Sequence, residues 1–118
     1  MDIPIGRDYT FTLKVLEPDS FLPLDVTGYT GIMNIYKRAD DTNLTTITLS
    51  PVPTTAQDGY MTGTVSGSDT ISVVPIKGSA ADDYYVKDEY AGFISITKSG
   101  APNINVTIER ITFMPTGA

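Results

Sequence analysis

The sequence predicts an all-β fold, a sandwich of two antiparallel sheets built from about seven to eight short strands. Thr is the commonest residue, and Val, Ile, Tyr and Phe fill blocks of alternating hydrophobicity, all types favoured on half-buried pleated surfaces. Turn-forming residues interrupt these blocks roughly every 8–12 residues, a spacing typical of sandwiches. No segment of ten or more residues carries a sustained helical period.

The first half of the chain supplies four predicted strands, at residues 9–16, 30–37, 44–49 and 60–65. In the first of these, Phe11, Leu13 and Val15 point to one face, because side chains of a pleated strand alternate between its faces. Both faces of the second are fairly apolar, which favours a central position. Residues 38–43 are expected to form a hairpin loop, and Pro51 is expected to end central pairing because proline cannot donate to a ladder.

The second half is less regular. Residues 70–76 are expected to form a strand ended by Pro75, the alternative being a short helical turn capped by Ser68 or Asp69. Residues 84–86 form a short strand or an irregular connection, and residues 92–97 form a strand.

The last predicted strand covers residues 106–113, and its apolar phase slips along its length. Val106 and Ile108 share one parity, whereas Ile111 and Phe113 have the other. A bulge near Glu109–Arg110 would restore a single buried face, because a bulge inserts one extra residue into the ladder. The alternative is a strand that passes between two environments.

Length and charge restrict the class of protein. The 118 residues fit a single domain spanning 1–118, with an N-terminal arm at 1–7 and a short tail at 114–118. Met1–Gly6 lacks the basic start and apolar core of a signal peptide, and no apolar run approaches the roughly 18 residues that span a bilayer. The net charge is −6 and the basic residues are scattered, so neither nucleic acid nor a membrane is an expected partner.

The missing residue types restrict the chemistry further. Without His or Cys the chain has no Ser–His or Cys–His pair and no zinc or haem site of the usual kinds. Carboxylate-pair catalysis needs two carboxyls about 5–9 Å apart across a cleft, for which a two-sheet domain of this length has little room. We therefore expect no enzyme activity, no catalytic residues, no metal and no cofactor.

Two acidic loops are nevertheless candidate sites. Tyr84, Tyr85 and Tyr90 stand among four carboxylates, whose oxygens suit a sugar or calcium: Asp82, Asp83, Asp88 and Glu89. The favoured interpretation is a solvated acidic loop whose tyrosines pack against the sandwich edge. A third interpretation, beside the ligand site and the solvated loop, is that the tyrosines form part of a subunit interface, where Tyr is enriched. Asp40, Asp41 and Asn43 resemble a partial calcium loop, but hairpin-loop chemistry is sufficient to explain them.

The segment Met1–Gly6 is the remaining distinctive feature. Pro4 keeps it extended, and Ile3 and Ile5 make it apolar. Such an arm can lie across a neighbouring subunit, or its two Ile side chains can complete the sandwich edge of their own chain. The sequence favours the two interpretations equally.

The order of these features resembles a known group of modules. The chain begins with an early strand in IPIGRDYTFTLKV, followed by a turn and by LDVTG before the second strand. A hairpin, an Asp-Gly turn and DDYYVKDEYAGFISI come next. This order resembles small Ig-like β-sandwich modules of tailed-phage virions, notably the N-terminal module of baseplate upper proteins, and related modules of head fibres and other appendages. We expect a departure from their plan, because the sequence stops at Ala118 just after its last predicted strand, without a receptor-binding extension.

The resemblance implies an Ig-like β-sandwich and a non-catalytic structural role in a bacteriophage virion assembled in the host cytoplasm. The module is expected to dock on capsid, neck or tail proteins, as a decoration, adaptor or baseplate component, and on copies of itself. Ile3, Pro4, Ile5, Tyr84, Tyr85 and Tyr90 are its candidate interface. The alternative is a carbohydrate-binding or host-adhesion module that uses the three tyrosines.

Overall fold

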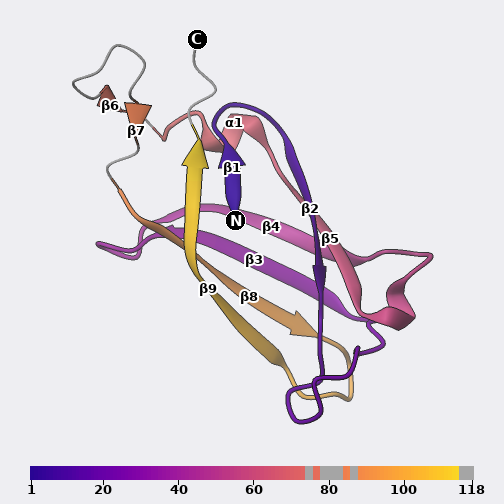
Figure 1. Ribbon diagram of the computed structural model, residues 1–118. Helices are drawn as coiled ribbons and strands as arrows, with labels where there is room; N and C mark the ends of the chain where they lie inside the picture. Colours follow the sequence, from indigo (N-terminus) through magenta and orange to yellow (C-terminus); the bar gives the residue numbers. More distant parts are fainter. Residues whose placement is uncertain (74–75, 78–83, 86–87, 115–118) are drawn as a thin grey trace.

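The computed structural model describes residues 1–73, 76–77, 84–85 and 88–114 (Figure 1). The all-β prediction is confirmed: seven strands form one sheet in the order β1-β9-β8-β3-β4-β5-β2, and two more pair as β6-β7. The elements are β1 (Asp2–Pro4), β2 (Tyr9–Lys14), β3 (Thr30–Lys37), β4 (Asn43–Pro51), η1 (Ala56–Asp58), β5 (Tyr60–Val65), α1 (Gly67–Thr70), β6 (Ile76–Lys77), β7 (Tyr84–Tyr85), β8 (Tyr90–Thr97) and β9 (Ile104–Met114).

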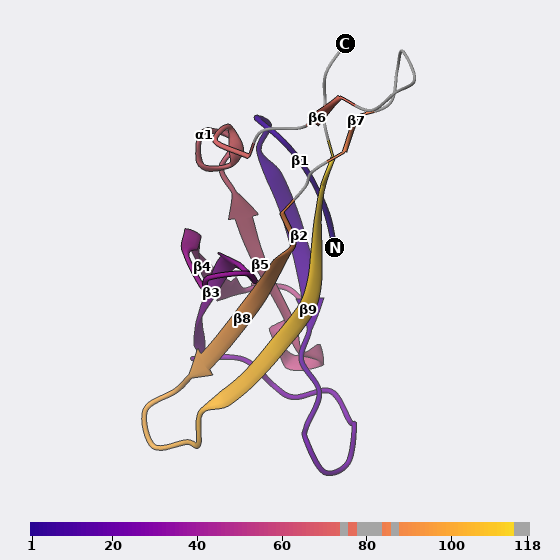
Figure 2. The same cartoon turned by 90° about the vertical axis from the view of Figure 1, so that its left-hand side faces the viewer.

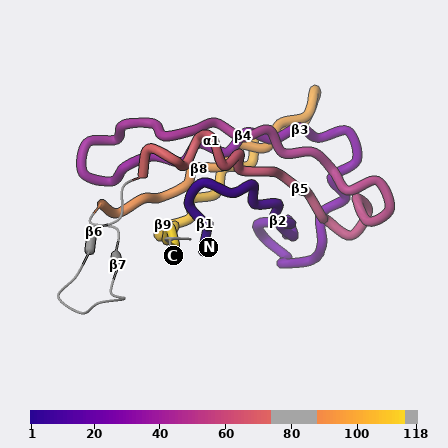
Figure 3. Tube along the Cα trace, turned by 90° about the horizontal axis from the view of Figure 1, so that it is seen from above, coloured from indigo at the N-terminus to yellow at the C-terminus, as the bar shows by residue number. Residues whose placement is uncertain are grey.

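The sheet curls into a nearly closed barrel, so the prediction of two separate sheets is wrong. The cause is β4, which is longer than its alternating block suggests. Most of β4 pairs with β3, but its end pairs with β5 through Ser50↔Thr62 and Pro51↔Met61. The same strand therefore joins what would otherwise be two layers. Seen from above, β3 and β4 lie opposite β1 and β9 (Figure 3).

The sheet is mixed, which corrects the prediction that all pairing is antiparallel. The N-terminal arm runs beside the end of β9 in the same direction, with Ile3 opposite Phe113. Thr112 N donates to Met1 O at 2.9 Å and Ile5 N donates to Met114 O at 3.0 Å. The arm therefore completes the sheet edge of its own chain. Figure 2 shows β1 alongside the end of β9.

The strand predicted at residues 70–76 is wrong in its first part. Gly67–Thr70 forms one helical turn, and Ser66 rather than Ser68 or Asp69 occupies the N-cap position, without a side-chain capping bond. The Thr70 side chain is fully buried and its hydroxyl accepts a hydrogen bond from Gly6 N at 2.8 Å. Tertiary hydrogen bonding has thus outweighed the strand preference of a β-branched residue.

Of the two interpretations of the last strand, the structure agrees with the bulge near Glu109–Arg110. Tyr90 pairs with Ile111 and Gly92 pairs with Ile108, so Glu109 and Arg110 together stand opposite the single residue between Tyr90 and Gly92. The extra residue returns Ile111 to the buried face, where it is 3 % exposed.

One apolar core fills the barrel. Its members include nine buried strand residues with at most 4 % exposure: Ile3, Met33, Ile35, Ile47, Leu49, Met61, Val65, Ile94 and Ile96. Leu49 lies between two glycines, because a Cβ on Gly63 would lie 2.6 Å from Leu49 Cδ2 and one on Gly31 would lie 2.9 Å from Leu49 Cβ. These two glycines make room for a large side chain at the bend of the sheet.

Candidate functional site

The barrel remains open between β2 and β9, and an apolar groove lies along this opening. Among the described residues, β2 pairs in a strand ladder with β5 alone, and residues 104–111 of β9 pair with β8 alone. Leu13 and Val15 line the groove from the β2 side, and Val106 and Ile108 line it from the β9 side. We call this cavity of about 360 Å³ the seam groove.

The loop after β2 forms one end of the seam groove. Phe21 and Leu16 line the groove and are 74 % and 40 % exposed. Phe21 has a φ of 58°, an unusual value for a bulky side chain, and it is held there because Phe21 N donates to Glu17 O at 3.0 Å and Leu22 O accepts from Glu17 N at 2.8 Å. The loop lies at the same end of the barrel as the β8–β9 connection (Figures 1 and 2).

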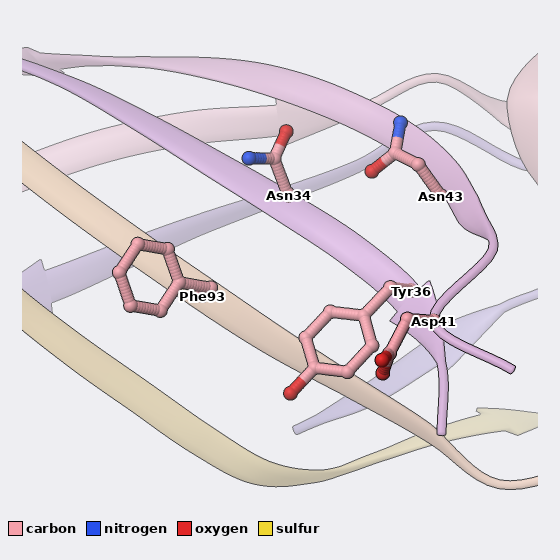
Figure 4. Close-up of a pocket in the computed structure, with 5 residues that line it drawn as sticks. All are labelled: Asn34, Tyr36, Asp41, Asn43 and Phe93. Atoms are coloured by element: carbon pink, nitrogen blue, oxygen red, sulfur yellow. The ribbon is translucent and has the colours of Figure 1, made fainter. Parts of the chain in front are cut away.

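A second, shallower cavity of about 460 Å³ lies on the outer face of β3, β4 and β8 (Figure 4). Two aromatic rings and three hydrogen-bonding side chains line it, and we call it the outer-face depression: Asn34, Tyr36, Asp41, Asn43 and Phe93. Asn34 stands directly opposite Phe93 in the β3–β8 ladder, and Phe93 is 39 % exposed. Regular strands therefore hold the central pair of residues in place.

Hydrogen bonds order the polar side of the outer-face depression. Thr46 Oγ1 donates to Asn34 Oδ1 at 2.7 Å, and Asn43 Nδ2 donates to Thr46 Oγ1 at 3.3 Å. In the part of the chain that the structure describes, no residue bonds the Asn34 amide nitrogen, the Tyr36 hydroxyl or the Asp41 carboxylate. These three groups remain able to bond a ligand.

The structure separates the residues predicted as an interface. Ile3 and Ile5 belong to the core at 0 % and 9 % exposure, and Pro4 pairs with Met114 at the sheet edge. Tyr90 is 6 % exposed, and its ring meets that of Phe113 edge to face at 4.9 Å between centroids.

Burial determines the chemistry of Tyr90. It raises the pKa of the phenol, and the negative charge of Asp88 raises it further. A ring this buried offers almost no surface for stacking on a sugar, so in this conformation Tyr90 acts as a core residue.

The other predicted tyrosines are described only by their backbone. Tyr84 pairs with Lys77 and Tyr85 with Ile76 in the β6-β7 ribbon, and their side chains lie outside the described part of the chain, as do Asp82 and Asp83. Their assignment to an interface stays a prediction.

The hairpin loop after β3 has the geometry of an ordinary turn. Thr42 N donates to Asp40 Oδ1 at 3.1 Å, and this bonding to Thr42 holds the pKa of the exposed Asp40 carboxyl below its usual value. Lys37 N donates to Thr42 O at 2.8 Å and closes the loop. Within the described ranges no three carboxylates gather as a metal site would require.

The described residues contain no helix long and apolar enough to cross a membrane. Comparison with known proteins found no family model that matches the chain and no characterised protein with significant sequence similarity to it.

The outer-face depression was not predicted from the sequence. Its signal was present, because Asn34 and Tyr36 share a parity on their strand and Phe93 is an aromatic residue on another. The pairing of β3 with β8, which brings these residues together, is not apparent from either strand alone.

Proposed function

We propose that the chain is a non-catalytic structural module of a tailed-phage virion, which docks on neighbouring virion proteins as the particle is assembled in the host cytoplasm. The resemblance of the strand and turn order to Ig-like virion modules supports the virion assignment. The seam groove supports docking: an apolar cavity between two unpaired strand edges is a surface that a partner can fill. Copies of the same chain are included among its neighbours.

The proposal also assigns the barrel to a more specific class of fold, the Ig-like fold. In an Ig domain, strands B and E belong to one sheet and strands C, F and G to the other. Here β2 pairs with β5, while β3, β8 and β9 are neighbours, an arrangement compatible with that scheme. The departure is β4, which connects the two groups into one continuous sheet.

The occupant that best fits the seam groove is an extended segment of a neighbouring virion protein. Unpaired edges of β2 and β9 present backbone N–H and C=O groups, which an added strand can bond. The groove between them is lined mainly by Leu, Ile and Val side chains, so alternate apolar side chains of that strand would be buried there. A helix cannot bond either edge through its backbone, because its own backbone groups are already paired.

Mass spectrometry and antibody labelling of purified virions test the assignment directly. We expect the chain at a fixed copy number in intact particles, with labelling at one location on the capsid, neck or tail. Its absence from intact particles would overturn the proposal.

A pair of substitutions tests the role of the seam groove. Val106→Lys places a charge in the groove at a side chain that is 44 % exposed, so the fold should tolerate it. Ile71→Lys is the matched control, because Ile71 is 71 % exposed and does not line the groove. We expect Val106→Lys to reduce incorporation into particles by about tenfold or more, the effect of roughly 1.4 kcal/mol of lost binding, and Ile71→Lys to leave incorporation unchanged. Equal incorporation of the two folded variants would rule out the seam groove as the docking surface.

A further inference from the structure

We propose that the outer-face depression is a binding site for a small neutral saccharide, a function separate from docking through the seam groove. The proposal is carried by two aromatic rings and three hydrogen-bonding groups on one exposed sheet face, and no described residue bonds those three groups.

The rings supply the apolar part of the site. Phe93 is 39 % exposed on β8, and the Tyr36 ring lies on the neighbouring strand, so that the two flank the centre of the outer-face depression (Figure 4). An exposed aromatic ring can pack against the C–H face of a pyranose, removing apolar surface of both from water. Neither ring lies in the core, so stacking would require no rearrangement of the barrel.

The polar groups supply orientation and specificity. The hydrogen bond from Thr46 uses Asn34 Oδ1, which leaves the Asn34 Nδ2 group to donate to a sugar oxygen. The Asp41 carboxylate accepts hydrogen bonds only, and the Tyr36 hydroxyl can either donate or accept. Sugar hydroxyls likewise donate and accept, so donors and acceptors placed around a ring-stacking surface match them. The cavity of about 460 Å³ lies within the ordinary range for small-ligand sites, about 300–1,000 Å³.

Charge selects a neutral ligand over an anionic one. Asp41 lines the outer-face depression and Asp40 precedes it in the same loop. Of the two cations nearby, Lys37 is paired with Asp88 at 3.6 Å and Arg38 donates to Glu109 O at 3.0 Å, so two carboxylates face one cation that no carboxylate pairs among the described residues. A sialylated or sulfated glycan, or a nucleic acid, would therefore meet net negative charge at this surface.

A glycan array followed by titration tests the site, with neutral hexose and N-acetylhexosamine oligosaccharides beside sialylated and sulfated ones. We expect the intact protein to bind at least one neutral saccharide and to bind the anionic glycans more weakly. Absence of saccharide binding, or binding to anionic glycans alone, would overturn the proposal.

Matched substitutions locate the binding. Phe93→Ala should weaken the affinity for the array ligand by about tenfold or more, because stacking is lost. Phe21→Ala, which removes an exposed ring from the seam groove, should change that affinity less than about twofold. Asn34→Ala should likewise weaken the affinity for the array ligand. Its control is Asn105→Ala, which removes an exposed Asn side chain on β9 and should leave that affinity nearly unchanged.

Urea unfolding of each variant confirms that it is folded before affinities are compared. Equal saccharide affinities for Phe93→Ala and Phe21→Ala, both folded, would place binding elsewhere and overturn the proposal. Virion incorporation is measured separately, so an absence of saccharide binding would not affect the test of docking through the seam groove.

Discussion

The hydrogen bonds of Thr70 fix the turn between β1 and β2, and their removal is predicted to destabilise the barrel. Thr70 is fully buried, accepts from Gly6 N at 2.8 Å and donates to Gly67 O at 3.2 Å. Thr70→Val keeps nearly the same shape but leaves both backbone groups without these bonds. An unsatisfied N–H costs about 1–3 kcal/mol, and the added methyl group recovers at most about 0.8 kcal/mol. We expect a net loss of about 1–2 kcal/mol.

Urea unfolding followed by circular dichroism measures this loss. With a slope of about 1–3 kcal/mol per M for a small protein, the midpoint should fall by about 0.5–1 M. Thr64→Val is the control, because its hydroxyl is exposed and pairs with that of Thr10 at 2.9 Å, and its effect should stay within about 0.5 kcal/mol. If Thr70→Val unfolds at the wild-type midpoint, the reasoning that this hydroxyl secures the turn is refuted.

Three further predictions concern packing and pH. Gly67→Ala should cost about 2–3 kcal/mol, because its Cβ would lie 2.7 Å from backbone atoms. Gly92→Ala should cost less, about 1 kcal/mol, because its Cβ would meet the ends of two side chains, Met33 Cε at 2.8 Å and Ile111 Cδ1 at 3.0 Å; similar urea midpoints would contradict this. Leu49→Ala should lower the free energy of unfolding by about 3–5 kcal/mol, and a loss below about 1 kcal/mol would show that the bend does not depend on it. Because the pKa of Tyr90 is raised in the folded state, stability from its neutral phenol is complete below the unfolded value near 10.0 and is lost as pH rises through the folded value; wild type should therefore weaken more than Tyr90→Phe above pH 10, and parallel pH profiles would refute this.

Local pattern was sufficient to locate most strands. Alternation placed β2, β3, β5 and β8 to within two residues, and the change of parity between Ile108 and Ile111 located the bulge correctly. Both signals depend on one physical fact, that adjacent side chains of a strand point to opposite faces. A strand with one buried face must therefore record that face in its sequence.

The candidate site was less predictable, because it depends on which strands are neighbours. Phe93 and Asn34 are far apart in the chain and meet only through the register of β3 with β8. The same holds for the seam groove, whose walls come from β2 and β9. Tyr90 agrees with the favoured interpretation in its packing, because its ring lies against Phe113, but it belongs to strand β8 and not to a loop.

The sequence by itself determined the all-β class, the alternating faces of the strands and the change of parity near Glu109–Arg110, because each follows from the pattern of a residue and its immediate neighbours. Only the tertiary structure decided that β4 joins both groups of strands, that the N-terminal arm pairs in parallel with β9, and that residues 67–70 form a helical turn. Each of these depends on hydrogen bonds between residues distant in the chain, whose partners no local pattern specifies. The seam groove and the outer-face depression are products of that long-range pairing.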